Sequence, residues 1–464
     1  MRAGRTRTGL GVLLIMLSAC VLGVAGYFVA ARLSAVTVVA TAPPLPAEVV
    51  AAGTAPAPTA TPVPAPPATL RGVAAVLAAP LADPRLGTRV LAQVRDAGTG
   101  AVLLSKGAAT STSPASTAKL ATTTALLSVK DPNARIITRV VAGPRPGSVV
   151  LVGAGDPTLS GAKGGAASAY PDAARISDLA AQLKAQIDLN VTSIIDDTSL
   201  FSGPAVSPDW DASDVPTSYG APITALMVDG GRDTPTSVIR SADPAAAAGK
   251  ALASALGLPA SAVTSGVAPA GARTLATVQS PPLSELVEQA LIDSDNVIAE
   301  QLARQVALAT DKPASFAGAA VAVARVLGQL GVNITGALRD GSGLARSDRL
   351  SPAQLTAILQ VTTSPDPARA ALHDVLAGLP VAGWDGTLAD RYLTSSQSGA
   401  GVVRAKTGTL TSVSALAGVV HDASGRQLIF ALMADQVGPT AADTVSAEAA
   451  LDAVAAALAG CGCS

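Results

Sequence analysis

Three short motifs, far apart in the chain, constrain most strongly what this sequence can fold into. The first is Ser116-Thr-Ala-Lys119, followed by a segment, 121–129, whose residues favour a helix. Positions three apart on a helix share a face, with Cβ atoms about 5–6 Å apart, so the Lys119 amine is expected beside the Ser116 hydroxyl. A serine hydroxyl is a weak nucleophile until a neighbouring base takes its proton. The pair therefore predicts nucleophilic catalysis by a lysine-activated serine.

The other two motifs are Ser294-Asp-Asn296, which opens a predicted helix, and Lys406-Thr-Gly-Thr409, which ends a predicted strand. Taken singly, each has an ordinary structural explanation. Ser294 can cap a first helical turn, and a strand can simply leave a sheet at Lys406. All three motifs in this order are the set typical of class A β-lactamases and penicillin-binding proteins, which makes coincidence a poor explanation.

Composition excludes several other kinds of site. Only three cysteines occur, Cys20, Cys461 and Cys463, so the body of the chain offers no disulfide framework and no cysteine-rich zinc site. The two histidines, His373 and His421, stand in ordinary surroundings, which favours lysine as the catalytic base. The net charge is −1 and no basic nucleic-acid face is evident. We expect neither a metal nor a cofactor.

The amino-terminal region has the pattern of an export and anchoring segment. Residues 1–9 are basic and polar, and the segment 10–32 contains an uncharged apolar run. A bilayer-spanning helix needs about 20 such residues, whereas the core of a cleaved signal peptide has about 7–15. We therefore expect a signal anchor with residues 1–9 in the cytoplasm. Lipidation of Cys20 is the alternative, because Leu17-Ser-Ala-Cys20 resembles a lipoprotein cleavage box.

The anchor is followed by a spacer. Residues 33–70 are rich in proline and alanine, a composition that builds no core and favours extended chain. We expect this linker to hold the rest of the protein away from the outer face of the membrane. The expected location is the extracytoplasmic cell envelope, with membrane anchoring through 10–31, or secretion if the segment is cleaved.

The body of the chain falls into two groups of predicted elements. Strand-like segments near its two ends, joined by hairpin turns, predict one antiparallel five-stranded sheet: 89–96, 101–106, 401–406, 413–421 and 427–435. With flanking helices, residues 71–134 and 276–464 are expected to form one α/β domain. Alternating short strands and helices over 135–275 predict an inserted α/β domain. Because a ring closed across one residue is strained, Cys461-Gly-Cys463 is expected to lie in an unstructured tail.

The chemistry assigns a role to each motif residue. Ser116 attacks a carbonyl to form an acyl-enzyme, and Lys119, neutral when it acts, takes the proton. Burial and the neighbouring Lys406 are both expected to lower the pKa of Lys119. Ser294 is expected to relay a proton to the leaving amine. Backbone N–H groups of Ser116 and Thr409 are candidates for the oxyanion hole.

The remaining motif residues are expected to bind substrate. Asn296 can hydrogen-bond the substrate amide and orient Lys119. A substrate ending in a free carboxylate is expected from the positive charge of Lys406, assisted by Thr407 and Thr409. Gly408 would let the substrate backbone lie against the strand edge.

Spacing separates the known users of this motif set. The long stretch 120–293 leaves room for an inserted domain, whereas class A β-lactamases are compact there. Their deacylating glutamate follows the Ser-Asp-Asn segment, and this sequence has no glutamate between Glu300 and Glu448. A β-lactamase-like hydrolase and a catalytically weak wall-binding module remain the alternatives. The missing glutamate argues against the first, and the intact motif set argues against the second.

From about residue 75 to 460 the chain resembles the D-alanyl-D-alanine carboxypeptidase/endopeptidases of the penicillin-binding protein 4 type (DacB-like, low-molecular-mass class C). Beyond the three motifs, the resemblance rests on further segments: Gly153-Ala-Gly-Asp-Pro-Thr-Leu159, Asp197-Thr-Ser-Leu-Phe201 through Trp210, Ala221-Pro-Ile-Thr-Ala-Leu226, Asp340-Gly-Ser-Gly-Leu344 and Leu379-Pro-Val-Ala-Gly-Trp-Asp-Gly-Thr-Leu388. Their turn-prone sequences are expected to be structural rather than chemical.

The resemblance implies a serine β-lactamase/penicillin-binding transpeptidase-like fold. It also implies removal of the terminal D-Ala from peptidoglycan stem peptides, cleavage of D-Ala–diaminopimelate cross-links, and covalent inhibition by β-lactams such as penicillin. Some members recognise the diaminopimelate side chain through an acid and a tyrosine of the inserted domain. Asp214 and Tyr219 stand at about the matching place here.

Overall fold

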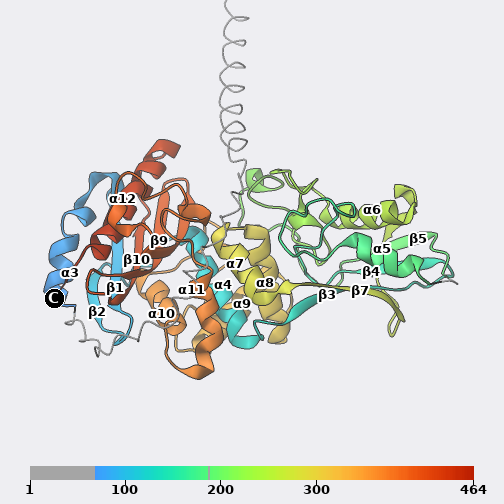
Figure 1. Cartoon of the computed structure of the whole chain (residues 1–464), viewed down its shortest axis with the longest axis horizontal. Helices are drawn as coiled ribbons and strands as arrows, with labels where there is room; N and C mark the ends of the chain where they lie inside the picture. Colours follow the sequence, from blue (N-terminus) through green and yellow to red (C-terminus); the bar gives the residue numbers. More distant parts are fainter. Residues whose placement is uncertain (1–67, 187–188, 464) are drawn as a thin grey trace, which may run out of the picture. The chain divides into compact units, whose positions relative to one another are not determined.

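A computed structural model of the chain describes residues 68–186 and 189–463 (Figure 1). The expected cytoplasmic segment 1–9, the expected anchor 10–32 and all but the end of the linker 33–70 lie outside these residues. Within the described ranges, no helix is both long and apolar enough to cross a membrane.

The first sheet has the strand order β2-β1-β10-β9-β8 and is antiparallel throughout. It unites segments from both ends of the body, as the sequence predicts: β1 (Val90–Asp96), β2 (Val102–Lys106), β8 (Val403–Leu410), β9 (Val413–His421) and β10 (Gln427–Ala434). Strand β8, which carries the Lys406 motif, lies at the edge of the sheet. The expected five-stranded sheet is confirmed.

Helices cover both faces of this sheet because side chains of successive strand residues point to opposite faces. In β10, Ile429 and Met433 belong to a core formed with α4 (Lys119–Val129), α8 (Asn296–Ala309), α9 (Phe316–Gln329) and α10 (Pro352–Thr362). The alternate residues Leu428 and Phe430 pack in a second core with α3 (Leu70–Leu77) and α12 (Ala441–Ala459). The result is a helix–sheet–helix sandwich (Figure 1).

A second sheet lies in the middle of the chain, with strand order β6-β5-β4-β3-β7 and both parallel and antiparallel neighbours. Its elements are β3 (Arg135–Ala142), β4 (Ser148–Val152), β5 (Ser193–Asp197), β6 (Val263–Ser265), β7 (Thr274–Pro282), and the covering helices α5 (Ile176–Lys184) and α6 (Pro244–Leu256). The sheet continues to Pro282, past the boundary expected at 275, because β7 pairs along β3. The remaining helices, α7 (Leu283–Ile292) and α11 (His373–Ala377), belong to the first core.

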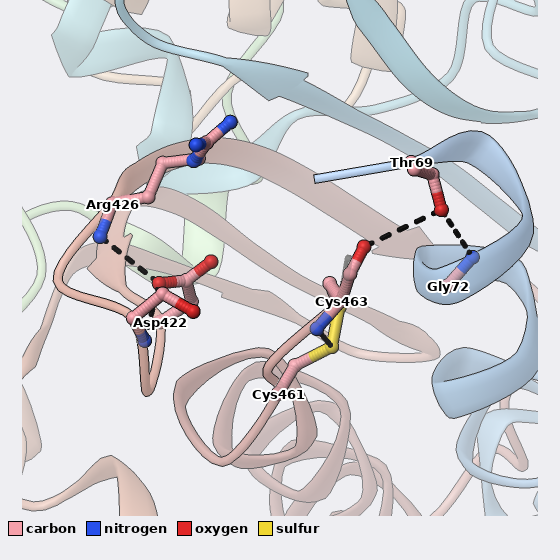
Figure 2. The surroundings of a disulfide bond; sticks show 7 residues. Thr69, Gly72, Asp422, Arg426, Cys461 and Cys463 are labelled. Carbon is pink, nitrogen blue, oxygen red and sulfur yellow. Dashed lines mark hydrogen bonds between the residues drawn. A yellow bond between two sulfur atoms is a disulfide. The ribbon is translucent and has the colours of Figure 1, made fainter. Parts of the chain in front are cut away.

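The carboxyl terminus differs from the expectation. Cys461 and Cys463 are both buried and form a disulfide. The carbonyl oxygen of Cys463 accepts a hydrogen bond of 2.7 Å from the backbone N–H of Thr69, so the end of the chain closes onto the start of α3 (Figure 2). A Cβ on Gly72 would lie 2.4 Å from that oxygen, which explains the glycine there. The prediction of an unstructured tail was wrong, because the backbone contacts of the tail order it.

Candidate active site

The serine and lysine of the first motif are in hydrogen-bonding contact. Ser116 lies in a short 3-10 turn, Ala115–Ala118, and Lys119 begins α4 immediately afterwards. The Nζ of Lys119 lies 2.9 Å from the Oγ of Ser116. Lys119 is fully buried, whereas Ser116 is half-buried. Helix α4 is buried on all its sides over residues 119–127, so the pair stands on a rigid element.

Two further acceptors fix the Lys119 amine. Its Nζ lies 2.5 Å from Oδ1 of Asn296 and donates to the carbonyl oxygen of Ser342 over 2.8 Å. Asn296 in turn donates from Nδ2 to the carbonyl oxygen of Tyr219, at 3.0 Å. The first and second motifs are therefore joined directly through Lys119 and Asn296.

The second motif forms a tight turn into α8. Asp295, and not Ser294 as the sequence suggested, is the N-cap: its Oδ1 accepts from the N–H groups of Val297 and Ile298. Ser294 adopts a left-handed backbone conformation with φ of 55° and is half-buried. Within the described residues, no hydrogen bond joins its hydroxyl to Lys119. Because Asp295 caps the helix, the Ser294 hydroxyl is not used as a cap and remains available for other contacts.

The third motif lies on edge strand β8, against the serine turn. Lys406 is fully buried, and its Nζ donates to the carbonyl oxygen of Thr407 over 3.0 Å. A Cβ on Gly408 would lie 2.6 Å from the carbonyl oxygen of Pro114, so the glycine permits close contact between β8 and the segment that carries Ser116. This contact is a packing reason for Gly408, beside the predicted approach of substrate.

The hydroxyl groups of the third motif already have partners. Thr407 donates from Oγ1 to Oγ1 of Thr387 at 2.9 Å. Thr409 is exposed and donates to the carboxylate of Glu448 in α12. Glu448 is the first glutamate after Glu300 in the sequence, and the fold places it at the end of the third motif.

Burial dominates the electrostatics of the two lysines. It lowers the pKa of Lys119 to about 8, although the carboxylates of Asp340, Asp295 and Glu300 act in the opposite direction. Burial also holds the pKa of Lys406 well below its ordinary value, with a smaller contribution from the positive charge of Lys119. A large fraction of Lys119 is therefore neutral near pH 8, as a base must be. The described residues contain no group of three or more histidine, cysteine or acidic side chains arranged to hold a metal ion.

Of Asp214 and Tyr219, only Tyr219 is hydrogen-bonded to a motif residue within the described part of the chain, and only through its main chain. Tyr219 contributes its backbone carbonyl to Asn296, while its side chain is 62% exposed. Asp214 is half-buried, and burial, assisted by the neighbouring Asp211, raises its pKa. The structure thus brings Tyr219 to the motif residues through its main chain and leaves both side chains accessible.

The loop Asp340–Leu344 is the part of the site that residue patterns missed. Its expected role was structural, yet Ser342 supplies an acceptor to Lys119. The buried Asp340 carboxylate orders the loop by accepting from the N–H groups of Gly343 and Ala345 and from Nε1 of Trp210, at 2.7–2.8 Å. The Asp-Gly-Ser-Gly sequence was the available signal, since an acid followed by glycines often binds its own backbone.

Comparisons with known proteins agree with this geometry. The D-Ala-D-Ala carboxypeptidase 3 (S13) family matches residues 73–238 and 232–458. The chain is 44% identical to the carboxypeptidase DacB of Mycolicibacterium smegmatis over 467 residues, which covers 99% of this chain and 98% of that protein. It is 45% identical to a carboxypeptidase of Mycobacterium tuberculosis over 399 residues, 84% of each chain.

A solved structure agrees on the fold. Penicillin-binding protein 4 (dacB) of Haemophilus influenzae superposes with a TM-score of 0.65 at 20% identity, covering 82% of this chain and 98% of that one. The expected penicillin-binding-protein fold is confirmed, and so is the family resemblance. By sequence and by fold, the chain belongs to the D-Ala-D-Ala carboxypeptidase 3 (S13) family.

Proposed function

We propose that this protein is a serine-type D-Ala-D-Ala carboxypeptidase that acts on peptidoglycan stem peptides through an acyl-enzyme on Ser116. The observation that carries the proposal is the distance of 2.9 Å between the Nζ of Lys119, a fully buried lysine, and the Oγ of Ser116. A neutral amine at hydrogen-bonding distance is the base that a serine nucleophile requires.

The reaction has two steps, acylation of Ser116 and hydrolysis of the acyl-enzyme. Ser116 Oγ bonds to the carbonyl carbon of the penultimate D-Ala while its proton passes to Lys119, and the bond to the terminal D-Ala breaks. The proton held by Lys119 passes by way of the Ser294 hydroxyl to the leaving amine. Water then attacks the ester carbonyl and gives a proton to Lys119, and this proton returns to Ser116 as the acid is released. Cleavage of a D-Ala–diaminopimelate cross-link uses the same steps, because only the leaving amine differs.

Strand β8 would hold the substrate. A peptide can add to a sheet edge through main-chain hydrogen bonds. β8 is the edge strand of its sheet, and residues 380–382 bond to it only over 403–405, ahead of the Lys406 motif. Lys406, Thr407 and Thr409 would bind the terminal carboxylate, and Gly408 would let the substrate backbone lie against the strand edge. The backbone N–H groups of Ser116 and Thr409 would stabilise the oxyanion, and Asn296 would bind the substrate amide.

Two finer features belong to the same proposal. Asp214 and Tyr219, with accessible side chains, would recognise the free end of a diaminopimelate side chain. If Asp214→Ala cleaves diaminopimelate peptides and truncated peptides at unchanged relative rates, this assignment is wrong. The enzyme would work in the cell envelope outside the cytoplasmic membrane, anchored through residues 10–31, and mass spectrometry of the mature amino terminus tests the anchor.

Labelling by penicillin separates this function from its alternatives. We expect the purified full-length chain to form a stable covalent adduct at Ser116, to release D-Ala from a stem pentapeptide, and to lose both activities in Ser116→Ala. Ser111→Ala, a matched change at an exposed serine nearby, should leave both unchanged. Rapid turnover of penicillin would indicate a β-lactamase, and absence of any adduct would indicate a binding module.

A further inference from the structure

Asp295 lies between Ser294 and Asn296 of the second motif, and the reaction steps above do not use it. Its carboxylate is 4% exposed and is ringed by donors. Oδ2 accepts from the Tyr170 hydroxyl at 2.9 Å and from Arg240 at 2.9 Å, and Arg232 lies 3.4 Å away. Oδ1 caps helix α8. We call Asp295, Tyr170, Arg232 and Arg240 the Asp295 cluster.

The three partners of Asp295 come from the middle of the chain. Tyr170, Arg232 and Arg240 all lie between β3 and β7, the first and last strands of the second sheet in chain order. They also bind one another, since Arg232 donates to the Tyr170 hydroxyl at 2.5 Å and its guanidinium lies 4.9 Å from the centre of the Tyr170 ring. The region between β3 and β7 therefore binds the second motif through a single carboxylate, that of Asp295.

The backbone around the cluster is shaped to fit it. The turn Asp229–Gly231 has three consecutive residues with positive φ, at 52°, 64° and 78°. A Cβ on Gly230 would lie 2.1 Å from the Tyr170 hydroxyl and 2.9 Å from a guanidinium nitrogen of Arg240. Arg240 also donates to the carbonyl oxygen of Gly230. The absence of a Cβ at Gly230, where the backbone is left-handed, thus leaves the space in which the donors converge.

Asp295 is adjacent to Asn296, whose Oδ1 lies 2.5 Å from the Nζ of Lys119. We propose that Asp295 is a positioning residue through which the inserted region, by way of Tyr170 and Arg240, sets the placement of Asn296 and the charge felt by Lys119. The inference rests on the proposed function, since it takes Lys119 as the base. The region between β3 and β7, which supplies Tyr170 and Arg240, would then influence the catalytic base as well as any contact it makes with substrate.

The charges around Lys119 make the inference testable by pH. Three carboxylates act on it, those of Asp340, Asp295 and Glu300, and each favours the protonated amine. The charge of Lys119 in turn lowers the pKa of Lys406, so the two amines compete for protons, and Arg304 pairs with Glu300 at 3.1 Å. The negative charge of Asp295 is compensated by Arg240 and Arg232, which outweigh burial and hold the pKa of Asp295 below its ordinary value. A change in the cluster therefore alters the field at Lys119 with a sign that depends on the residue changed.

The experiment follows acylation of the full-length chain by labelled penicillin from pH 6 to pH 10. Asp295→Asn removes a negative charge, so the midpoint of the rate profile should move to lower pH. Arg240→Met leaves Asp295 less compensated, so the midpoint should move to higher pH. We expect opposite shifts of about half a pH unit or more and maximal rates about tenfold lower. Arg240→Lys, which keeps the charge, should return the midpoint towards that of the unmodified chain.

Controls separate this role from simple loss of stability. Arg426→Met breaks another partly buried ion pair, with Asp96 at 3.2 Å, and should leave the midpoint in place. Tyr170→Phe removes only a hydroxyl, so it tests the inference even where a charge change prevents folding; a smaller upward shift is expected.

Unshifted midpoints, or shifts in one direction for both Asp295→Asn and Arg240→Met, overturn the inference. Failure of the unmodified chain to label at Ser116 overturns the proposed function and this inference together. Normal labelling at Ser116 with unshifted midpoints in the variants overturns this inference alone.

Discussion

The amine of Lys119 donates a hydrogen bond of 2.8 Å to the backbone carbonyl of Ser342, across 223 residues of sequence. A carbonyl oxygen can accept from the charged amine and, more weakly, from the neutral one, so this contact orients the lysine in both states. It also makes the position of the Asp340–Leu344 loop part of the catalytic geometry. The buried carboxylate of Asp340, which orders that loop, should therefore affect both folding and acylation.

Asp340→Asn tests this connection. Oδ1 of Asp340 accepts from Gly343 and Oδ2 accepts from Ala345. Asparagine has a single side-chain oxygen and can keep only one of these bonds, so we expect a loss of about 2–3 kcal/mol in the free energy of unfolding. The acylation midpoint should move to lower pH, because a carboxylate that favours protonated Lys119 is removed. Chemical denaturation and the pH profile of labelling measure the two effects. Asp366→Asn, at an exposed cap, should change neither.

Lys406 should influence the pH dependence with the opposite sign. Because the pKa of Lys119 is about 8 and the neutral amine is the base, the acylation rate should rise about tenfold per pH unit below pH 8 and level off above it. The two amines compete for protons, because the charge of Lys119 lowers the pKa of Lys406. Lys406→Met removes this competition, which should raise the pKa of Lys119 and move the midpoint to higher pH. A midpoint that stays in place would show that the two amines do not interact, and a midpoint that falls would contradict the expected sign.

Gly408→Ala should damage the site by crowding. The new Cβ would lie 2.6 Å from the carbonyl oxygen of Pro114, which is backbone and cannot rotate away, so β8 or the serine turn must shift. We expect a cost of about 1–3 kcal/mol in stability and a loss of acylation of at least about tenfold. Gly328→Ala is the matched control, because its Cβ would meet open space at the end of α9. If Gly408→Ala labels at the normal rate, the contact does not constrain the site.

Sequence patterns predicted much of this architecture because its signals are local. Helix α8 and strand β9 have the bounds expected from periodicity, and the hairpin turn before β10 marks the register. The three motifs, occurring in their known order, predicted that Ser116, Lys119 and Asn296 would share one site. These features depend on residues close in sequence or on motifs whose joint occurrence is known from protein families.

Long-range contacts account for what the sequence did not reveal. The carbonyl of Ser342 and that of Tyr219 are main-chain atoms, and every residue carries one, so no residue type marks them as ligands of Lys119 or Asn296. The N-cap of α8 is Asp295 rather than the predicted Ser294, because the helix begins one residue later than the serine suggested. The tail is ordered by a backbone contact between Cys463 and Thr69, near opposite ends of the described chain.

The disulfide should stabilise the protein without affecting catalysis. It closes a very short loop between Cys461 and Cys463, for which the restriction of the unfolded chain is worth only about 1–2 kcal/mol. Its surroundings are α3 and the turn after β9 (Figure 2). Reductant should lower Tm slightly and leave acylation at Ser116 unchanged, as thermal unfolding and labelling can establish. The double variant Cys461→Ser/Cys463→Ser should respond to reductant in neither measurement, and a slower acylation rate on reduction would contradict this expectation.

Glu448 should weaken the binding of a substrate carboxylate. It accepts a hydrogen bond from Thr409 and lies 4.0 Å from Arg391, whose main partner is Asp452 at 2.7 Å. Its negative charge is thus only partly compensated, and it stands at a residue proposed to hold the terminal carboxylate. Glu448→Gln keeps the acceptor oxygen and removes the charge, so KM for a peptide ending in free D-Ala should fall about threefold, with kcat unchanged.

Salt and substrate chemistry distinguish this charge effect from a change in shape. The difference in KM should shrink as ionic strength rises, because a partly exposed charge is screened, and it should vanish for a peptide whose carboxyl end is amidated. Glu288→Gln makes the same chemical change at an exposed position of α7 and should leave KM as it is. A KM that rises in Glu448→Gln would mean that Glu448 helps Thr409 to bind the substrate, because loss of the carboxylate would then release the hydroxyl from its binding orientation.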